Sequence, residues 1–236
     1  MNDHVSGLPV LALLRQQSWL SPAFPTGAYA YSHGLEWAVE VGVVRDRKSL
    51  VDWLEADLCH GSGRNEGIFF SEAWRCAVEG DRSRLLDVAE QAAVFRGTSE
   101  LALESSQQGS ACLTTLRRVW PDSTLDWLSE ALSERRLPAA LAVVLGVRSA
   151  REGIPVRLAL AAFLHSYLSS QVNAGVRLVP LGQTDGQLAI AELERAVLVT
   201  SADAEEATLD DLGSAAIMVD LSSMAHEAQY TRLFRS

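Results

Sequence analysis

Apolar residues recur at three- and four-residue spacing along almost the whole chain, and the alternation typical of strands is nearly absent. The clearest example is the segment Pro155–Leu178, which opens on a proline suited to a first helical position and is followed by Pro180. Its apolar stripe consists of Leu158, Ala162, His165, Leu168, Val172 and Val176. The sequence therefore predicts an all-α, single-domain bundle of roughly ten helices over residues 1–236.

Capping residues and glycines indicate where these helices begin and end. Asp46 is expected to cap one helix. The break after that helix is expected at Gly61, Gly63 and Asn65. The segment Leu137–Arg148 is apolar all round, which predicts a helix inside the core.

Residues 21–40, SPAFPTGAYAYSHGLEWAVE, predict a shaped loop followed by a helix. Pro22, Pro25 and Gly27 constrain the loop, because proline fixes φ and glycine permits conformations that other residues avoid. The helix is expected to begin near Tyr31, so Gly34 would lie inside it at a cost of about 1 kcal/mol relative to alanine. We therefore expect another segment to pack closely against Gly34.

Two charged residues, Glu36 and Arg177, stand in segments that are otherwise apolar or small. A charged side chain in such surroundings is rarely left unpaired. One interpretation pairs the two residues with each other or with nearby backbone. The other interpretation places both on a surface that binds a partner protein.

The C-terminal segment is rich in large apolar and arginine side chains, namely Tyr230, Arg232, Leu233, Phe234 and Arg235. These residue types are enriched at interface hot spots, and chain ends usually fray unless they dock. Two interpretations remain open: the tail folds onto its own body, or it orders against a partner. We expect the first ~10 and the last ~12 residues to be mobile until a partner binds.

The charge balance narrows the class of partner. Lys and Arg number 20 and Asp and Glu number 30, so the formal net charge is −10. This balance argues against nucleic acid and anionic membranes as partners. No apolar run approaches the ~20 residues that span a bilayer, and the N-terminal residues do not have the pattern of a secretory signal. Three widely spaced cysteines are no disulfide framework, which favours a reducing, cytoplasmic location.

The histidines and cysteines do not predict a metal site. Cys59 and His60 are adjacent, so their side chains diverge on a helix. His226 is followed by Glu227 without the second histidine of an H-E-x-x-H motif. His165 falls on the apolar stripe and is expected to be a hydrogen-bonded core residue. We therefore predict no tightly bound metal or cofactor.

Three separated stretches resemble one known family. They are SPAFPTGAYAYSHGLE from Ser21, VNAGVRLVPLGQTDGQ over Val172–Gln187, and SMAHEAQYTRLFRS over Ser223–Ser236. Their content and order are similar to those of the UreF family of urease accessory proteins. The resemblance extends over the whole chain, although residues 80–150 match only in general helical character.

The resemblance implies a non-enzymatic scaffold that forms a two-fold dimer. Such a protein bridges UreD (also called UreH) and the GTPase UreG, and the assembly delivers nickel to apo-urease when GTP is hydrolysed. The residues expected on the GTPase face are Phe24, Pro25, Tyr31, Glu36 and Arg177. The residues expected on the UreD face are His226, Gln229, Tyr230, Arg232, Leu233, Phe234 and Arg235. The apolar faces of Pro155–Leu178 and of Leu137–Arg148 are offered as the dimer surface.

Two other classes stay open. A helical enzyme would need an enclosed pocket at the Phe24–Tyr31 loop, with Glu36 as a general base of raised pKa. A nickel-binding metallochaperone would use Cys59, His60 and His226 as ligands.

Overall fold

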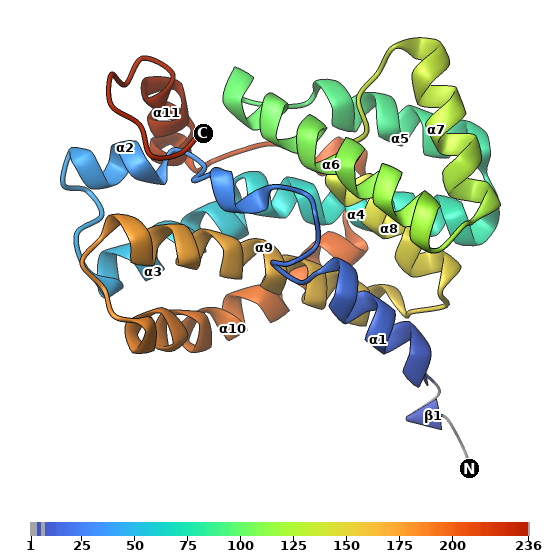
Figure 1. The fold of residues 1–236 in the computed structure, drawn as a ribbon, viewed down its shortest axis with the longest axis horizontal. Coiled ribbons are helices and arrows are strands. Elements are labelled where there is room, and N and C mark those ends of the chain that lie inside the picture. Colours follow the sequence, from blue (N-terminus) through green and yellow to red (C-terminus); the bar gives the residue numbers. More distant parts are fainter. Residues whose placement is uncertain (1–3, 6–7, 236) are drawn as a thin grey trace.

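Helices account for nearly all of the computed structural model, which describes residues 4–5 and 8–235 (Figure 1). The α-helices are α1 (Val10–Trp19), α2 (Leu35–Glu40), α3 (Arg47–His60), α4 (Ser62–Glu79), α5 (Arg82–Val94), α6 (Ser99–Val119), α7 (Ser123–Arg135), α8 (Leu141–Arg151), α9 (Val156–Leu178), α10 (Gln183–Glu206) and α11 (Ile217–His226). Short 3₁₀ helices cover Ala28–Ala30 (η1) and Leu209–Asp211 (η2). Two-residue strands, β1 (His4–Val5) and β2 (Leu8–Pro9), pair ahead of α1. The predicted all-α class is confirmed.

The expectations for the chain ends fall partly outside the described residues. Residues 1–3 and 6–7 belong to the N-terminal stretch, and Ser236 ends the C-terminal one. Within the described part of the chain, no helix is both long enough and apolar enough to cross a membrane.

The centre of the molecule is the pair α4 and α8 (Figure 1). The two helices approach closely at Gly146, where an added Cβ would lie 2.4 Å from the carbonyl oxygen of Phe70. Every residue from Ala142 to Ser149 is buried. The predicted core helix is therefore confirmed, although it begins at Leu141 rather than at Leu137. Because other helices of the same chain cover α8, this helix has no exposed apolar face that a second copy could contact.

The predicted break at Gly61, Gly63 and Asn65 is shorter than expected. Helix α3 ends at His60 and α4 begins at Ser62, so only Gly61 separates them. Gly63 and Asn65 are buried inside α4. A Cβ on Gly63 would lie 2.8 Å from the Cα of Leu58, so this glycine allows two helices to pack closely and does not interrupt one.

The helix expected near Tyr31 begins later, at Leu35. Gly34 is its N-cap, with a φ of 74°, and does not lie inside the helix. The expected close neighbour of Gly34 is confirmed, because a Cβ there would lie 2.5 Å from the backbone nitrogen of Ser223 in α11. Glycine thus brings α2 and α11 into direct backbone contact.

The predicted face of α9 is correct at Leu168 and Val172, which are buried, and wrong at Leu158 and His165. Leu158 is 54% exposed and His165 is exposed, so His165 is not a core residue. The buried face instead consists of Ala159, Leu160, Phe163, Leu164, Leu168, Gln171, Val172, Ala174 and Gly175. Helix α9 is apolar or small around most of its surface, so the periodicity alone could not fix which side faces α4 and α10.

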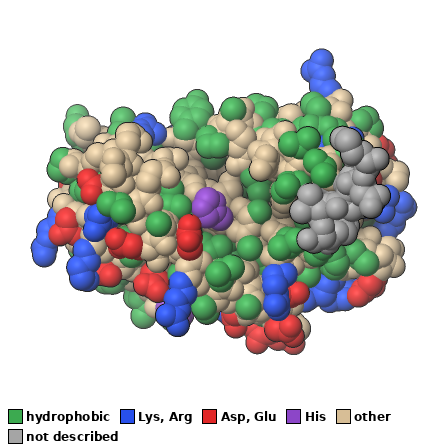
Figure 2. Space-filling model, turned by 90° about the horizontal axis from the view of Figure 1, so that it is seen from below, with side chains coloured by type: hydrophobic (Ala, Val, Ile, Leu, Met, Phe, Trp, Pro, Cys, Tyr) green, Lys and Arg blue, Asp and Glu red, His purple; other side chains and the backbone are tan. Residues whose placement is uncertain are grey.

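The open side of α9 lines a groove of about 940 Å³ that also involves α1, the 21–31 segment and α10. Figure 2 shows the molecule from below, with hydrophobic side chains spread across the middle of this side and many charged side chains toward its edges. Four leucine and valine side chains of α1 are exposed, namely Val10, Leu11, Leu13 and Leu14. With the groove, these side chains give this side of the molecule an exposed apolar surface.

Candidate functional site

The three stretches that carry the family resemblance meet at one place. Helix α11 packs on α2 and α6, and the residues after α11 run back across α2 toward the end of α9 (Figure 1). Five residues form the centre of this contact, and we call them the tail seat: Glu36, Glu100, His226, Arg232 and Phe234.

Glu36 holds the backbone of the tail. Its Oε1 accepts a hydrogen bond from the Leu233 amide at 2.6 Å, and its Oε2 accepts one from the Phe234 amide at 2.9 Å. The Nε2 atom of His226 lies 3.2 Å from the same Oε2. Glu36 is only 8% exposed, and its partners are distant in sequence. The interpretation that Glu36 pairs with Arg177 or with nearby backbone is therefore wrong.

His226 lies between two carboxylates. It is completely buried at the end of α11. Its Nδ1 atom lies 2.7 Å from Glu100 Oε2, opposite the contact with Glu36. The other oxygen of Glu100 accepts a hydrogen bond from Arg232 at 2.7 Å. The seat thus surrounds the ring with two acceptors, each of which also holds part of the tail.

Phe234 connects the tail to the end of α9 and to the 24–31 loop. Its ring is buried, and the guanidinium carbon of Arg177 lies 4.4 Å from the ring centroid. Arg177 also donates to the carbonyl of Tyr29 at 2.9 Å. The Arg235 amide donates to the carbonyl of Ala30 at 2.7 Å. Residues expected on two different partner faces are therefore in direct contact.

Some of the remaining candidate side chains are held by hydrogen bonds or packing, and others face outward. Tyr31 is buried and donates to Gln107, and Gln229 donates to Glu40. Phe24 is partly buried against the core, whereas Pro25 and Arg235 are exposed.

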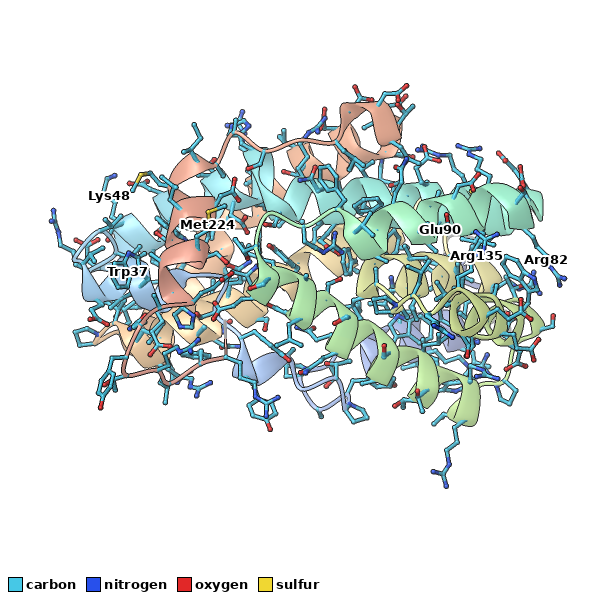
Figure 3. All side chains as sticks on the ribbon, turned by 90° about the horizontal axis from the view of Figure 1, so that it is seen from above. Trp37, Lys48, Arg82, Glu90, Arg135 and Met224 are labelled. Carbon is cyan, nitrogen blue, oxygen red and sulfur yellow. The ribbon has the colours of Figure 1, made fainter. Side chains whose placement is uncertain are left out.

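Beside the seat is a surface that we call the α11 face, made of Ile217, Met218, Leu221, Met224, Tyr230 and Leu233, all about half-exposed or more. Figure 3 shows Met224 at the same end of the molecule as Trp37 of α2, and away from Arg82, Glu90 and Arg135. Exposed aliphatic and methionine side chains gathered on one surface are typical of a protein-binding site. The tail seat and the α11 face together present a continuous candidate interface.

Polar residues of α6 hold both the tail and the loop, and sequence reasoning missed most of them. They are Glu100, Glu104, Gln107 and Gln108, which are spaced along one side of the helix. Glu104, Gln108 and Gly109 are all buried, and a Cβ on Gly109 would lie 2.0 Å from the carbonyl oxygen of Ala139. The run of small and polar residues at 104–112, ESSQQGSAC, is the sequence signal for this close contact, but it does not identify the partner residues.

A second buried network fixes the residues just before α2. His33 Nε2 lies 2.7 Å from Glu104, and its Nδ1 lies 3.1 Å from the Tyr167 hydroxyl, which donates to Asp57 at 2.7 Å. Burial by itself would lower the pKa of His33, but the charge and hydrogen bond of Glu104, with the charges of Asp57 and Glu66, raise the pKa to about 9. His33 is therefore a buried cation at neutral pH.

This network gives a pH dependence of stability with a defined sign. The folded-state pKa of His33 is above its unfolded value of 6.5, so its contribution is fully present below about pH 6.5 and is lost as the pH rises through about 9. Between about pH 6 and about pH 9.5, the free energy of unfolding of His33→Gln should fall less than that of the wild type, by about 2–3 kcal/mol. Urea denaturation at both pH values measures this difference, with His60→Gln as an exposed control. Equal losses in wild type and His33→Gln would contradict the assignment.

This geometry can be compared with what a helical enzyme and a nickel-binding metallochaperone would each require. Both oxygens of Glu36 already accept hydrogen bonds, and Glu36 lines neither the groove nor the small, partly open pocket of about 60 Å³ beside His33. This arrangement does not suit a general base. For the metallochaperone, a cysteine must bind metal as the thiolate. Burial raises the pKa of the Cys76 thiol to about 11, so this cysteine is not suited to that role at neutral pH. In residues 4–5 and 8–235, no three His, Cys, Asp or Glu side chains are grouped so that they could hold a metal ion.

Comparison with known proteins gives consistent matches over most of the chain. The family model described as UreF matches residues 44–194. A urease accessory protein UreF of Rhodopseudomonas palustris (strain BisB5) is 48% identical over 225 residues, which cover 95% of this chain and 91% of that protein. Proteins of the same name from Bradyrhizobium diazoefficiens and from Bradyrhizobium sp. (strain ORS 278) are 45% and 44% identical, over 95% and 98% of this chain and 92% and 94% of theirs.

Proposed function

Because the chain belongs to the UreF family of urease accessory proteins, we propose that it is a non-enzymatic scaffold that joins a UreD (UreH) protein to the GTPase UreG during GTP-dependent nickel insertion into apo-urease. In this role it works in the cytoplasm and binds proteins rather than nucleic acid or membrane. Nickel is cargo of the assembled complex, and this chain holds no tight site of its own.

The single observation that carries the proposal is the contact between the tail and the loop. The α11 face, with Tyr230 and Leu233, is proposed to bind UreD. The exposed side of the 24–31 loop, with Tyr29 and Arg177, is proposed to bind UreG. Since Arg177 stacks on Phe234, a change in one surface reaches the other through one contact. Adjacent surfaces of this kind would allow the scaffold to couple the binding of its two partners.

Self-association is proposed to use the side that carries the groove. The exposed apolar side chains proposed for this contact are Leu11, Leu13 and Leu14 of α1 and Leu158 of α9, of which Leu13 lines the groove. A two-fold dimer joined on this side would leave the α11 face of each copy available. We expect the isolated chain to elute as a dimer in size-exclusion chromatography.

A binding experiment with purified counterparts tests the scaffold role. Wild-type protein should form a ternary complex with the UreD and UreG proteins of its own source in pull-down and size-exclusion runs. Leu233→Ala should weaken UreD binding by about tenfold or more, because a half-buried apolar anchor is removed. Tyr29→Ala removes an exposed ring and keeps the Tyr29 carbonyl that Arg177 binds, so it should weaken UreG binding while it keeps UreD binding.

The control variant changes an exposed apolar residue away from both proposed surfaces. Val78→Ala removes an exposed apolar side chain near the end of α4, four residues before Arg82, which Figure 3 shows away from Met224 of the α11 face, and this variant should bind both partners normally. Glu36→Ala is a poor discriminating variant, because Glu36 holds the tail and its loss should affect both surfaces. A wild-type chain that binds neither partner would contradict the proposed function.

A further inference from the structure

We infer that Arg64 and Asn65 of α4 are positioning residues that hold the segment between α10 and α11 and thereby fix the place at which the α11 face is presented. We call this segment, residues 207–216, the connector. In the proposed function, on which this inference rests, the α11 face binds a UreD protein. The placement of α11 itself can be measured in the isolated chain.

Helix α11 is short and turns most of its apolar surface outward. It has ten residues, and an isolated helix of this length is marginal in water. Its buried residues are one valine, two serines and a histidine, namely Val219, Ser222, Ser223 and His226. Its larger apolar side chains belong to the α11 face and are exposed. The position of α11 therefore depends strongly on the segments that hold its two ends, which are the tail seat and the connector.

Arg75 of α4 fixes the start of the connector. Helix α10 ends at Glu206, and the last carbonyls of a helix have no partner inside it. Arg75 donates to the Glu205 carbonyl at 2.6 Å and to the Ala207 carbonyl at 2.7 Å. Its guanidinium also donates to the Glu72 carboxylate at 2.6 Å, and Glu72 is buried. This contact caps the end of α10 and directs the following residues onto α4.

Arg64 and Asn65 hold the middle of the connector. The Nε atom of Arg64 donates to the Asp203 carboxylate of α10 at 2.7 Å, and its Nη1 atom donates to the Asp211 carbonyl at 2.6 Å. The side-chain oxygen of Asn65 accepts a hydrogen bond from the Gly213 amide at 3.1 Å. Asn65 is buried, so loss of its oxygen would leave a donor without an acceptor. Two neighbouring residues near the start of α4 thus bind both a carbonyl and an amide of the connector.

The end of the connector sets where α11 begins. The Ala215 amide donates to the His60 carbonyl at 2.7 Å. Ala216, the N-cap of α11, lies against Gly61, where an added Cβ would be 2.9 Å from the Ala216 Cβ. Asn65 binds the chain only two residues before Ala215, so a connector released there is free to leave both contacts. The first turn of α11 then loses its fixed starting point.

Hydrogen–deuterium exchange of two backbone amides, measured by NMR, tests the placement of α11 in the isolated chain. The Ala215 amide has the bond described above, and the Val219 amide donates to the Ala216 carbonyl at 2.9 Å in the first turn of α11. No substitution at position 64 or 65 removes either acceptor, so a change in exchange reports the placement of the segment. In the double variant Arg64→Ala/Asn65→Ala, both amides should lose nearly all of their protection, and each single variant should lose part of it.

Binding measurements with purified UreD and UreG counterparts test the consequence for the α11 face. The affinity of a partner for a displaced surface falls with the fraction of molecules that still present that surface correctly. The double variant should therefore bind UreD about fivefold or more weakly than the wild type. Binding of UreG, whose proposed surface is the 24–31 loop, should weaken by a clearly smaller factor. A general loss of stability would lower both affinities alike.

Matched variants separate this role from the general effect of losing an arginine. Arg157 of α9 donates to the Glu205 carboxylate at 2.6 Å near the same end of α10, but its side chain is 64% exposed. Arg157→Ala should keep the wild-type exchange and both affinities, because an exposed ion pair contributes little. Arg64→Lys keeps a cationic donor for one of the two acceptors and should retain more protection than Arg64→Ala. Circular dichroism and urea denaturation establish that each variant is folded.

The positioning role and the proposed function can fail separately. Wild-type protection of both amides in the double variant, an equal loss of protection in Arg157→Ala, or lost protection with unchanged UreD binding would overturn the inference. If the wild type binds no UreD counterpart, the proposed function falls, and the exchange of the two amides alone decides whether Arg64 and Asn65 position α11. If the wild type binds UreD and the double variant keeps its protected amides, the scaffold role stands and the positioning role falls.

Discussion

Glu36→Ala is expected to free the C-terminal tail and to lower the free energy of unfolding by about 3 kcal/mol. The substitution removes the acceptor for the Leu233 and Phe234 amides and one of the two carboxylates that face buried His226. A buried donor that is left without an acceptor lowers the stability by its full desolvation penalty. This penalty is larger than the net contribution of an ordinary hydrogen bond. Urea denaturation measures the stability, and the rate of trypsin cleavage at Arg232 and Arg235 measures the release of the tail.

The control for this prediction is an exposed glutamate. Glu55→Ala on α3 should change stability by no more than about 0.5 kcal/mol and should leave the cleavage rate unaltered. An unchanged cleavage rate in Glu36→Ala would show that other contacts are enough to hold the tail, and would contradict the central role of Glu36 in the tail seat.

Gly146→Ala is expected to cost about 3 kcal/mol, although alanine is the better helix former. The new Cβ would lie 2.4 Å from the carbonyl oxygen of Phe70 and 3.2 Å from Ala73 Cβ. The nearest atom belongs to the backbone, so α4 and α8 would have to move apart at the centre of the core. Urea denaturation of the purified variant measures the cost.

A matched glycine on the surface provides the comparison. An added Cβ at Gly213 meets nothing within 4 Å, so Gly213→Ala should be within about 0.5 kcal/mol of the wild type. Equal stabilities for Gly146→Ala and the wild type would mean that the two central helices can separate at little cost, contrary to the packing described.

The helices were predictable because their signals are local. Asp46 accepts from the Ser49 amide at 2.8 Å and Asp81 accepts from the Arg84 amide at 3.0 Å, as capping residues do. Periodicity likewise identified α9 but placed Leu158 and His165 on the wrong side. A helix that is apolar or small around most of its circumference contains no local information about which side its neighbours cover.

The candidate site was predictable only in its parts. Glu36, Arg177 and the tail residues were selected by residue type and by motif, but no pattern in the sequence indicated that they touch. Gly34 illustrates the same limit, because the need for a close neighbour was predictable whereas its identity as α11 was not. Glu100 was missed because a glutamate in a polar helical segment is normally solvated.

The tail seat also has a consequence for the order of folding. The bond between Glu36 and the Phe234 amide joins residues that are 198 positions apart in the sequence. Contacts of such high sequence separation close late, because the entropy of a very long loop is lost before they form. The seat should therefore be absent from the folding transition state. Substitutions in it would accelerate unfolding and leave the folding rate nearly unaltered, so this site governs how long the native chain persists rather than how quickly it forms.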